Sequence, residues 1–323
     1  MTFKIGVTGA TGYVGRNIVR EALKHGYEVH VFTRNPTQID GAHEHHWEVN
    51  NSSVTENYAH LNLDALIHCA ALADDNADLQ ESLRVNAQGT LQALQLGNAK
   101  RFVHMSTASV YLNEVNKTDL LPTLHTPNVH VGLQEPYVYS KMVAECSLHD
   151  AVNSGTHFFV NPENKVVILR PHIVYGGDDT TLLPKLLKVT KIFGRKAFIC
   201  VPGGGKSVHS VTHIDTLTSA ALFVATVPNT KLLSRVNTYN VSDKQPVVLA
   251  HKIQEVIRET TGVNKVFVIN IPQRFAVKLA QWGNKLWIKG YLRKKPTVTE
   301  YAIKQLTENL TLNLEALTKL AST

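Results

Sequence analysis

The sequence lacks the features of a membrane-spanning, exported or disulfide-bonded protein. Its longest apolar runs, such as LDALIHCAALA and TSAALFVATV, are far shorter than the roughly 20 residues that a membrane-spanning helix needs. The N-terminus MTFKIGVTGA starts directly in a strand pattern, with no sign of an export signal. The three cysteines, Cys69, Cys146 and Cys200, are isolated, with neither the paired spacing of a zinc site nor a disulfide framework. These absences predict a protein of the reducing cytoplasm.

Nucleic-acid signatures are absent as well, although the chain is basic. Its 33 Lys and Arg residues outnumber 26 Asp and Glu residues, for a net charge of +7. No zinc-finger spacing, basic zipper or aromatic RNA-binding motif accompanies this charge, so we expect no nucleic-acid partner. The contents of 43% hydrophobic and 18% charged residues are those of an ordinary globular protein with a sizeable core.

A histidine-rich segment, HEHH at residues 43–46, has the residue types of a metal site without a suitable arrangement. Successive residues of a strand face opposite sides of a sheet, and no second group of ligands accompanies the segment. We therefore predict a surface strand here and no bound metal.

Short β-branched runs alternate with helix-length segments over the first 240 residues. This alternation predicts βαβ units and an α/β fold, a doubly wound parallel sheet of the Rossmann type with helices on both faces. The pattern loosens after about residue 172, where a smaller, mostly helical C-terminal lobe is expected. The predicted nucleotide domain comprises residues 1–172 and 208–242, and the substrate lobe comprises residues 173–207 and 243–323. The strand candidates are residues 4–10, 28–34, 63–70, 101–107, 166–171 and 236–242.

Three glycines, Gly9, Gly12 and Gly15, lie between the first strand and the first helix in KIGVTGATGYVGRN. Glycine lets a backbone approach a pyrophosphate, and a helix N-terminus presents free N–H groups to that anion. In this context the triplet predicts a dinucleotide site rather than a merely tight turn. The later segment VPGGGKS is not a nucleotide-triphosphate loop, because Cys200 stands where that motif needs glycine.

The end of the second strand indicates which dinucleotide binds. An NAD-selective site normally has an acidic residue here for the ribose 2′-hydroxyl, but this chain has Thr33 and Arg34. Since an arginine can pair with a 2′-phosphate, NADP is the preferred cofactor. The alternative is a solvated Arg34 with NAD bound.

The segment EPYVYSK contains two tyrosines and one lysine, and helical spacing separates their roles. Positions four apart share a helix face, so only Tyr137 can stand beside Lys141, whereas Tyr139 points elsewhere. A free phenol has a pKa of about 10, and a neighbouring ammonium favours its phenolate form. The pair can therefore exchange a proton near neutral pH, although many helices carry such a pair as a surface contact.

Several segments in the order of the chain resemble one family. TGATGYVG, DALIHCAA, VNAQGT, HMSTASVY, YVYSK, LRPHIVYG and VTHIDTLTSA are similar to the motifs of extended short-chain dehydrogenases/reductases, the NAD-dependent epimerase/dehydratase class, over about the first 240 residues. The stretch LRPHIVYGGDDTTLLPKLL resembles the 3β-hydroxysteroid dehydrogenase-like branch. This resemblance implies an NAD(P)-dependent oxidoreductase that transfers a hydride between nicotinamide and a hydroxyl or ketone carbon.

The resemblance also assigns roles to individual residues. It implies that Tyr137 moves the proton, that Lys141 binds the nicotinamide ribose, and that Thr107 orients the reacting oxygen, with Ser106 and Ser109 as competitors. Asn86 is expected to support the helix, and His68 and Cys69 to be buried in a strand. The expected cofactor contacts are Gly9, Thr11, Gly12, Tyr13, Val14, Gly15, Arg34, Ala70, Ala71, Tyr137, Lys141 and Pro171.

The substrate is expected to be a hydrophobic small molecule. Related nucleotide-sugar enzymes use an asparagine for the diphosphate where this chain has Ile173, although an epimerase or dehydratase of nucleotide sugars stays an alternative. A non-enzymatic NADP-binding sensor is the third hypothesis. The resemblance further implies a homodimer formed by helices around residues 78–97 and 136–152.

Residues 274–296 form a basic amphipathic stretch with an apolar stripe of Phe275, Leu279, Trp282 and Leu286. The favoured interpretation is a helix whose stripe faces the core and whose lysines are solvated. The alternatives are contact with an anionic membrane surface or with an acidic group of the substrate.

Overall fold

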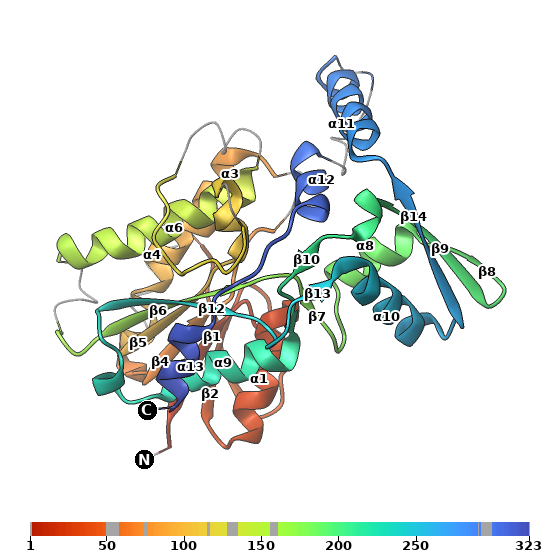
Figure 1. Ribbon diagram of the computed structural model, residues 1–323. Coiled ribbons are helices and arrows are strands. Elements are labelled where there is room, and N and C mark those ends of the chain that lie inside the picture. Colours follow the sequence, from red (N-terminus) through yellow and green to blue (C-terminus); the bar gives the residue numbers. More distant parts are fainter. Residues whose placement is uncertain are drawn as a thin grey trace.

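A seven-stranded parallel sheet organises the fold (Figure 1). The computed structural model describes residues 2–49, 58–73, 77–114, 117–127, 135–155, 161–289, 291 and 299–322. The strand order is β12-β6-β5-β4-β1-β2-β3, so the order reverses between β1 and β4. The strands are β1 (Lys4–Thr8), β2 (Glu28–Thr33), β3 (Ala42–His46), β4 (Ala65–His68), β5 (Arg101–Met105), β6 (Lys165–Pro171) and β12 (Val236–Val241). The inner strands β4, β5 and β6 are buried along almost their whole length, which suits a sheet that is covered on both faces.

Helices cover both faces of the sheet, which confirms the predicted doubly wound architecture. One face packs against α1 (Tyr13–Lys24), α9 (Ile214–Thr226) and α13 (Glu315–Ser322), through residues that include Ile18, Leu217 and Leu320. The opposite face packs against α4 (Gly89–Ala93) and α6 (Pro136–Asn153), through residues that include Ala93 and Leu148. The shorter helical segments nearby are η1 (Ala59–Leu61), α3 (Leu79–Leu83), η2 (Arg84–Gln88), η3 (Leu96–Asn98), η4 (Ala108–Asn113) and η6 (Asn229–Lys231).

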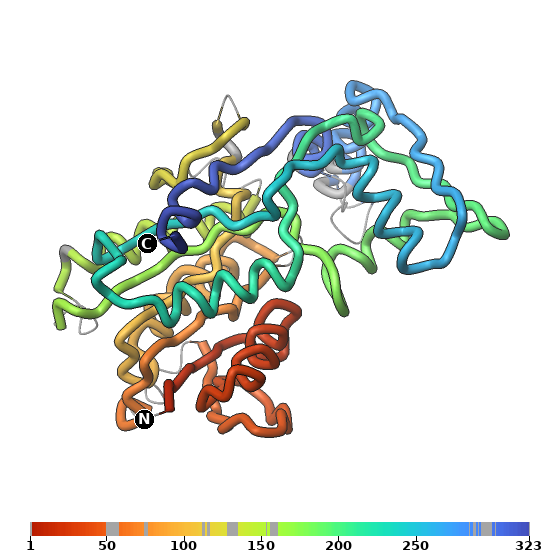
Figure 2. The backbone as a smooth tube through the Cα atoms, turned by 60° about the horizontal axis from the view of Figure 1, so that its bottom comes forward, coloured from red at the N-terminus to blue at the C-terminus, as the bar shows by residue number. Residues whose placement is uncertain are grey.

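A second lobe stands to one side of the main sheet (Figures 1 and 2). It contains a small sheet of β8 (Lys191–Phe193), β9 (Lys196–Pro202) and β14 (Lys265–Ile271), in which β9 pairs parallel to β14 and antiparallel to β8. Its helical segments are α8 (Leu182–Val189), η5 (Gly203–Gly205), α10 (Leu249–Thr261), α11 (Gln273–Ile288) and α12 (Glu300–Thr307). Two short ladders, β7 (Val174–Tyr175) with β11 (Thr212–His213) and β10 (Val208–His209) with β13 (Val247–Val248), join the lobe to the main domain.

The histidine-rich segment forms β3 at the edge of the main sheet, as predicted. The ring of His30 stacks on His43 and His45, with centroids 4.9 and 5.1 Å apart. Within the described ranges, no group of three or more histidine, cysteine or carboxylate side chains is arranged to hold a metal ion. None of the described helices has the length and apolar character needed to cross a membrane.

Candidate active site

The turn between β1 and α1 has positions where no side chain fits. Gly9 has φ +68°, and a Cβ on it would lie 2.6 Å from the backbone nitrogen of Ala70. A Cβ on Gly15 would lie 2.2 Å from the carbonyl oxygen of Gly9. Gly12 is the N-cap of α1, no side chain caps that terminus, and Thr11 beside it is exposed. An open helix N-terminus next to a glycine turn has the charge and the space that a pyrophosphate needs.

The other predicted cofactor residues lie at the same edge of the sheet. Parallel strands end at a common edge, so Arg34 after β2, Ala70 and Ala71 after β4, and Pro171 at the end of β6 all lie there. Arg34 and Ala71 are exposed. The backbone nitrogen of Ala70 also donates to Thr8 Oγ1 at 3.2 Å, which holds this turn against the glycine loop.

Two residues of α1 lie inward from this opening. Val14 is half-buried, whereas Tyr13 is buried and its hydroxyl donates to the carbonyl oxygen of Gly176 at 2.6 Å. Arg16, one turn later, pairs with Asp178 at 3.2 Å. The first turn of α1 is thus bonded to the segment that follows β7.

Lys141 is almost fully buried on α6. Its Nζ donates to the carbonyl oxygen of Met105, at the end of β5, over 2.8 Å. Burial lowers the pKa of Lys141 to about 8, and the carboxylate of Glu145 opposes this shift. At neutral pH this lysine is therefore still mostly protonated, but it loses its proton more easily than an ordinary lysine. Its ammonium group lies at the end of β5.

Tyr137 lies in the first turn of α6 and is half-buried, one helical turn before Lys141. Its carbonyl oxygen accepts a hydrogen bond from Ser140 Oγ, at 2.8 Å. Asn86 is fully buried and donates to Ser140 Oγ while it bonds both backbone groups of Leu72. Asn86 therefore clamps the start of α6 to the loop after β4, which confirms its predicted structural role.

The three candidate hydroxyls after β5 have different partners. Ser106 is buried, and its hydroxyl donates to Glu145. Ser109 accepts from Gln305 Nε2 at 3.4 Å, across the gap between the two lobes. Thr107 Oγ1 accepts from the backbone nitrogen of Ser109 at 3.1 Å, which leaves the hydroxyl hydrogen of this half-buried side chain for another acceptor. Thr107 and Ser109 thus both keep a hydroxyl hydrogen for a further acceptor, whereas that of Ser106 is engaged, and the choice of Thr107 stays a prediction.

His68 belongs to the buried strand, as expected. Its Nδ1 lies 2.7 Å from Thr8 Oγ1 and its Nε2 lies 3.2 Å from Thr90 Oγ1. Burial lowers the pKa of His68 to about 3, with a smaller contribution from the charge of Lys141. A neutral imidazole with both nitrogens engaged has a structural rather than a catalytic task.

A buried ion pair behind the site was missed from the sequence. Arg170 on β6 pairs with Glu145 on α6, and Arg170 also donates to Tyr111 at 3.1 Å. Tyr111 in turn donates to Asn240 on β12. Glu145 lies four residues after Lys141 on the same helix, so its spacing was a signal available in the sequence. This network fixes α6 against the sheet at the level of Lys141.

A cavity of about 590 Å³ opens beyond the end of β6. Most of its wall is apolar, with leucine and isoleucine side chains from α8 and α10, and its polar groups include His172 and Gln305. Ile173, which also lines it, has φ +44°, a conformation that is unusual for a β-branched residue. The main apolar lining residues are Ile173, Leu182, Leu183, Leu186, Leu249, Ile253, Val256 and Leu306.

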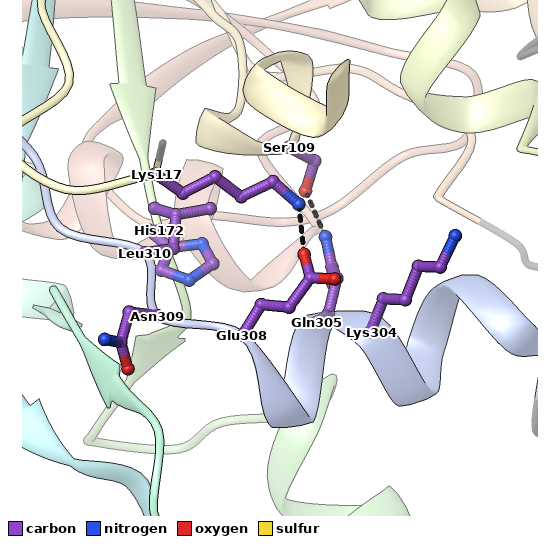
Figure 3. A pocket seen from close by; sticks show the side chains of 8 residues that line it. All are labelled: Ser109, Lys117, His172, Lys304, Gln305, Glu308, Asn309 and Leu310. Atoms are coloured by element: carbon purple, nitrogen blue, oxygen red, sulfur yellow. Dashed lines mark hydrogen bonds and ion pairs between the residues drawn. The ribbon is translucent and has the colours of Figure 1, made fainter. Parts of the chain in front are cut away.

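A smaller pocket shares His172 and Gln305 with this cavity (Figure 3). Lys117 Nζ contacts Glu308 at 2.6 Å there, beside the bond between Gln305 and Ser109. These two contacts connect the segment after β5 to α12. The segment that follows the predicted Thr107 and the wall of the cavity are thus joined directly.

Comparison with known proteins identifies the family and the fold. The model of the NAD dependent epimerase/dehydratase family matches residues 5–242. The chain belongs to the NAD-dependent epimerase/dehydratase family. The predicted resemblance is therefore confirmed, and with it the Rossmann-type fold and an enzymatic function.

Relatives in this family include named reductases. The chain is 28% identical to the 4-hydroxy-2-methyl-3-oxo-4-farnesyl-3,4-dihydroquinoline-1-oxide ketoreductase of Stigmatella aurantiaca, over 95% of this chain and 87% of the relative. It is 24% identical to the 2-alkyl-3-oxoalkanoate reductase of Stenotrophomonas maltophilia, over 94% and 89%. Among solved structures, the dTDP-glucose 4,6-dehydratase of Bacillus anthracis in complex with NAD shares the fold, with a TM-score of 0.65, 16% identity, and coverage of 100% of this chain and 91% of that one.

The residues present fit the NAD that this family uses. The glycine turn would hold the pyrophosphate, because a side chain at Gly9 or Gly15 would occupy its space or collide with the backbone. The strand order reverses between β1 and β4, the usual position of a bound dinucleotide, and Lys141 lies at the same edge of the sheet, at the end of β5. The nicotinamide would supply or accept the hydride there.

Proposed function

We propose that this enzyme is an NADP-preferring oxidoreductase that acts on a hydroxyl or ketone carbon of a hydrophobic small molecule. The observation that carries the proposal is the apolar cavity of about 590 Å³ beyond β6, whose wall residue Gln305 bonds to Ser109 in the segment after β5. Its volume suits a drug-sized ligand, and its wall is predominantly aliphatic. The two relatives named above are reductases of compounds that carry an alkyl or a farnesyl group, which supports the same substrate class.

Reduction of a ketone needs a hydride at the carbonyl carbon and a proton at the oxygen. Reduced nicotinamide, when bound, would supply the hydride. We assign the proton to the hydroxyl of Tyr137, with the charge of Lys141 stabilising the phenolate that remains, and we assign the orientation of the oxygen to Thr107. Solvent then reprotonates Tyr137. In the reverse direction the phenolate accepts the proton of an alcohol.

The decisive experiment combines a substrate series with one substitution. Turnover of aliphatic 3-oxo compounds is followed by NADPH absorbance, and kcat/KM should rise about fourfold for each added methylene until the cavity is filled, since each buried methylene contributes about 0.8 kcal/mol. Tyr137→Phe should abolish turnover, while fluorescence titration finds NADPH affinity within about threefold of the parent protein. Retained turnover in Tyr137→Phe would contradict the assigned mechanism.

The same assay distinguishes the other two hypotheses. A nucleotide-sugar epimerase keeps its cofactor through turnover and produces no net change in NADPH absorbance. Ile173 in the cavity wall counts against a bound diphosphate, because its side chain cannot donate the hydrogen bond that an asparagine at this position would donate. A sensor would bind NADPH and turn over no carbonyl compound in the series.

The preference for NADP depends on Arg34. A guanidinium forms charge-assisted hydrogen bonds with a 2′-phosphate, and an exposed bond of this kind contributes about 1.5 kcal/mol, or about tenfold in affinity. Arg34→Ser should therefore weaken NADPH binding about tenfold and leave NADH binding unchanged. Equal dissociation constants for NADH and NADPH in the parent protein would contradict the preference.

The predicted homodimer and cytoplasmic location also stay proposals. The dimer would use α3 and α4 together with α6, the helices of one face of the main sheet. Sedimentation velocity at several protein concentrations would detect it, and a purely monomeric protein would contradict it.

A further inference from the structure

The positive charge of the chain is concentrated in two segments. Residues 180–214 and 260–299 contain 14 of the 33 Lys and Arg residues and none of the 26 Asp and Glu residues. The rest of the chain carries 19 basic residues against the same 26 acidic residues, so it is net negative. The net charge of +7 therefore originates entirely from these two segments.

The fold brings the two segments together. The first segment contains α8, β8 and β9, and the second contains β14 and α11. Parallel pairing of β9 with β14 joins them in the small sheet of the outer lobe, residue by residue from Lys196 and Lys265 onward. In Figure 1 this sheet and α11 lie at the side of the molecule remote from β1 and β2.

One face of the small sheet is apolar and open. Val266, Ala197 and Ile199 point toward α10 and are buried, so the alternate residues of the same strands face away from it. On that outer face the ring of Phe198 stacks on Phe267, at 5.1 Å, and meets the ring of Phe193 edge-on at 6.0 Å. Phe193 is 68% exposed. The lysines that share this face are Lys191, Lys196 and Lys265.

Helix α11, which follows β14 directly in the chain, also has exposed apolar side chains together with lysines. The favoured interpretation of its apolar stripe as core-facing is wrong, since Phe275 and Trp282 are 62% and 60% exposed. The helix instead packs through Ala276 and Ala280 against Ile303 of α12. Small residues on the packed side allow close contact between the helices and leave the large apolar side chains outside.

We propose that the outer face of β8–β9–β14 and the exposed stripe of α11, together the basic apolar surface, dock on an anionic lipid bilayer. Exposed phenylalanine and tryptophan side chains enter the boundary between headgroups and acyl chains, and the surrounding lysines neutralise the anionic headgroups. Both properties are complementary to a lipid surface. A symmetric contact with a second copy of the chain would place cations against cations, and a nucleic acid would leave the apolar side chains uncovered.

The test is co-sedimentation of the full chain with vesicles at physiological ionic strength. Vesicles of phosphatidylcholine mixed with phosphatidylglycerol should bind the protein. Vesicles of phosphatidylcholine alone should bind it at least about tenfold less, because they lack the anionic headgroups that attract the lysines. The double variant Lys278→Glu/Lys285→Glu should lose about tenfold or more of this binding. Its matched control is Lys24→Glu/Lys319→Glu, an equal change of charge at exposed lysines of α1 and α13, which should bind like the parent.

The apolar contribution is tested separately. Phe193→Ser/Trp282→Ser should weaken binding to the anionic vesicles about tenfold or more, since two exposed aromatic anchors are removed. Leu233→Ser, at a leucine that is 95% exposed in the main domain, is the matched control and should have no effect. Circular dichroism checks the folding of every variant. All of them should fold like the parent, because the substituted side chains lie at the surface.

Either of two results would refute the proposal. The first is a failure of the charge test: either the parent protein does not bind anionic vesicles, or the test and control variants lose binding equally. The second is a lipid-free dimer that Phe193→Ser/Trp282→Ser converts to monomer without any change in vesicle binding. That second result would assign the basic apolar surface to contact between copies of the chain. Neither result involves turnover, so the test is independent of the proposed activity.

Discussion

Replacing Lys141 by methionine should make stability depend on pH in a defined way. The side chain is fully buried, and burial lowers its pKa from 10.5 to about 8. Below pH 8 the lysine is protonated in both the folded and unfolded states, so folding bears the full penalty of about 3 kcal/mol. Between pH 8 and 10.5 the folded state loses its proton first and the penalty declines, to about 1 kcal/mol at pH 10. Methionine has nearly the same shape and no charge.

The measurement is urea unfolding of the cofactor-free parent and Lys141→Met proteins at pH 7 and pH 10. The stability difference between them should change by about 2 kcal/mol in favour of the parent as the pH rises, whereas loss of the hydrogen bond to Met105 adds a constant of about 1 kcal/mol. His68 stays neutral over this range, because its pKa is about 3. A difference that stays constant between pH 7 and pH 10 would refute a buried, weakly held charge at Lys141.

Two further substitutions test the cofactor turn and the ion pair behind the site. Gly15→Ala places a Cβ 2.2 Å from the carbonyl oxygen of Gly9, so NADPH titration should find binding reduced at least about a hundredfold, whereas Gly26→Ala, with nothing within 4 Å, should cost only about 1 kcal/mol of stability and no affinity. Glu145→Gln leaves the buried Arg170 without its counter-charge, and thermal unfolding should show a loss of about 3–5 kcal/mol. Unchanged binding in Gly15→Ala, or a loss below about 1 kcal/mol in Glu145→Gln, would contradict these assignments.

The dinucleotide half of the site could be predicted because its signals are local. Gly9, Gly12 and Gly15 follow a strand and open a helix within a dozen residues, and a helical spacing of four relates Tyr137 to Lys141. The buried pair of Glu145 and Arg170 joins α6 to β6 across 25 residues, so only the folded chain shows that the two charges meet. The sequence carried the spacing of Glu145 but not the identity of its partner.

The outer lobe was predicted less completely. The strands β9 and β14 have alternating apolar residues, but their pairing joins residues 196–202 with residues 265–271, and no local pattern specifies so distant a partner. The apolar stripe of α11 was also visible in the sequence, although its direction was not. Amphipathic periodicity identifies a helix with two different sides, and whether the large or the small side packs inward depends on the neighbouring helix.

The bonds between the first turn of α1 and the segment after β7 connect the two halves of the site. Tyr13 donates to the carbonyl oxygen of Gly176, and both Gly176 and Gly177 line the apolar cavity. Tyr13, the first residue of α1, therefore also holds one edge of the apolar cavity. A shift of α1 on cofactor binding would move this edge directly, because a bond of 2.6 Å between the buried Tyr13 and the half-buried Gly176 allows little independent motion. For this reason we expect Tyr13→Phe to raise KM for the hydrophobic substrate more than it raises the dissociation constant of NADPH, and equal changes in both constants would contradict the connection.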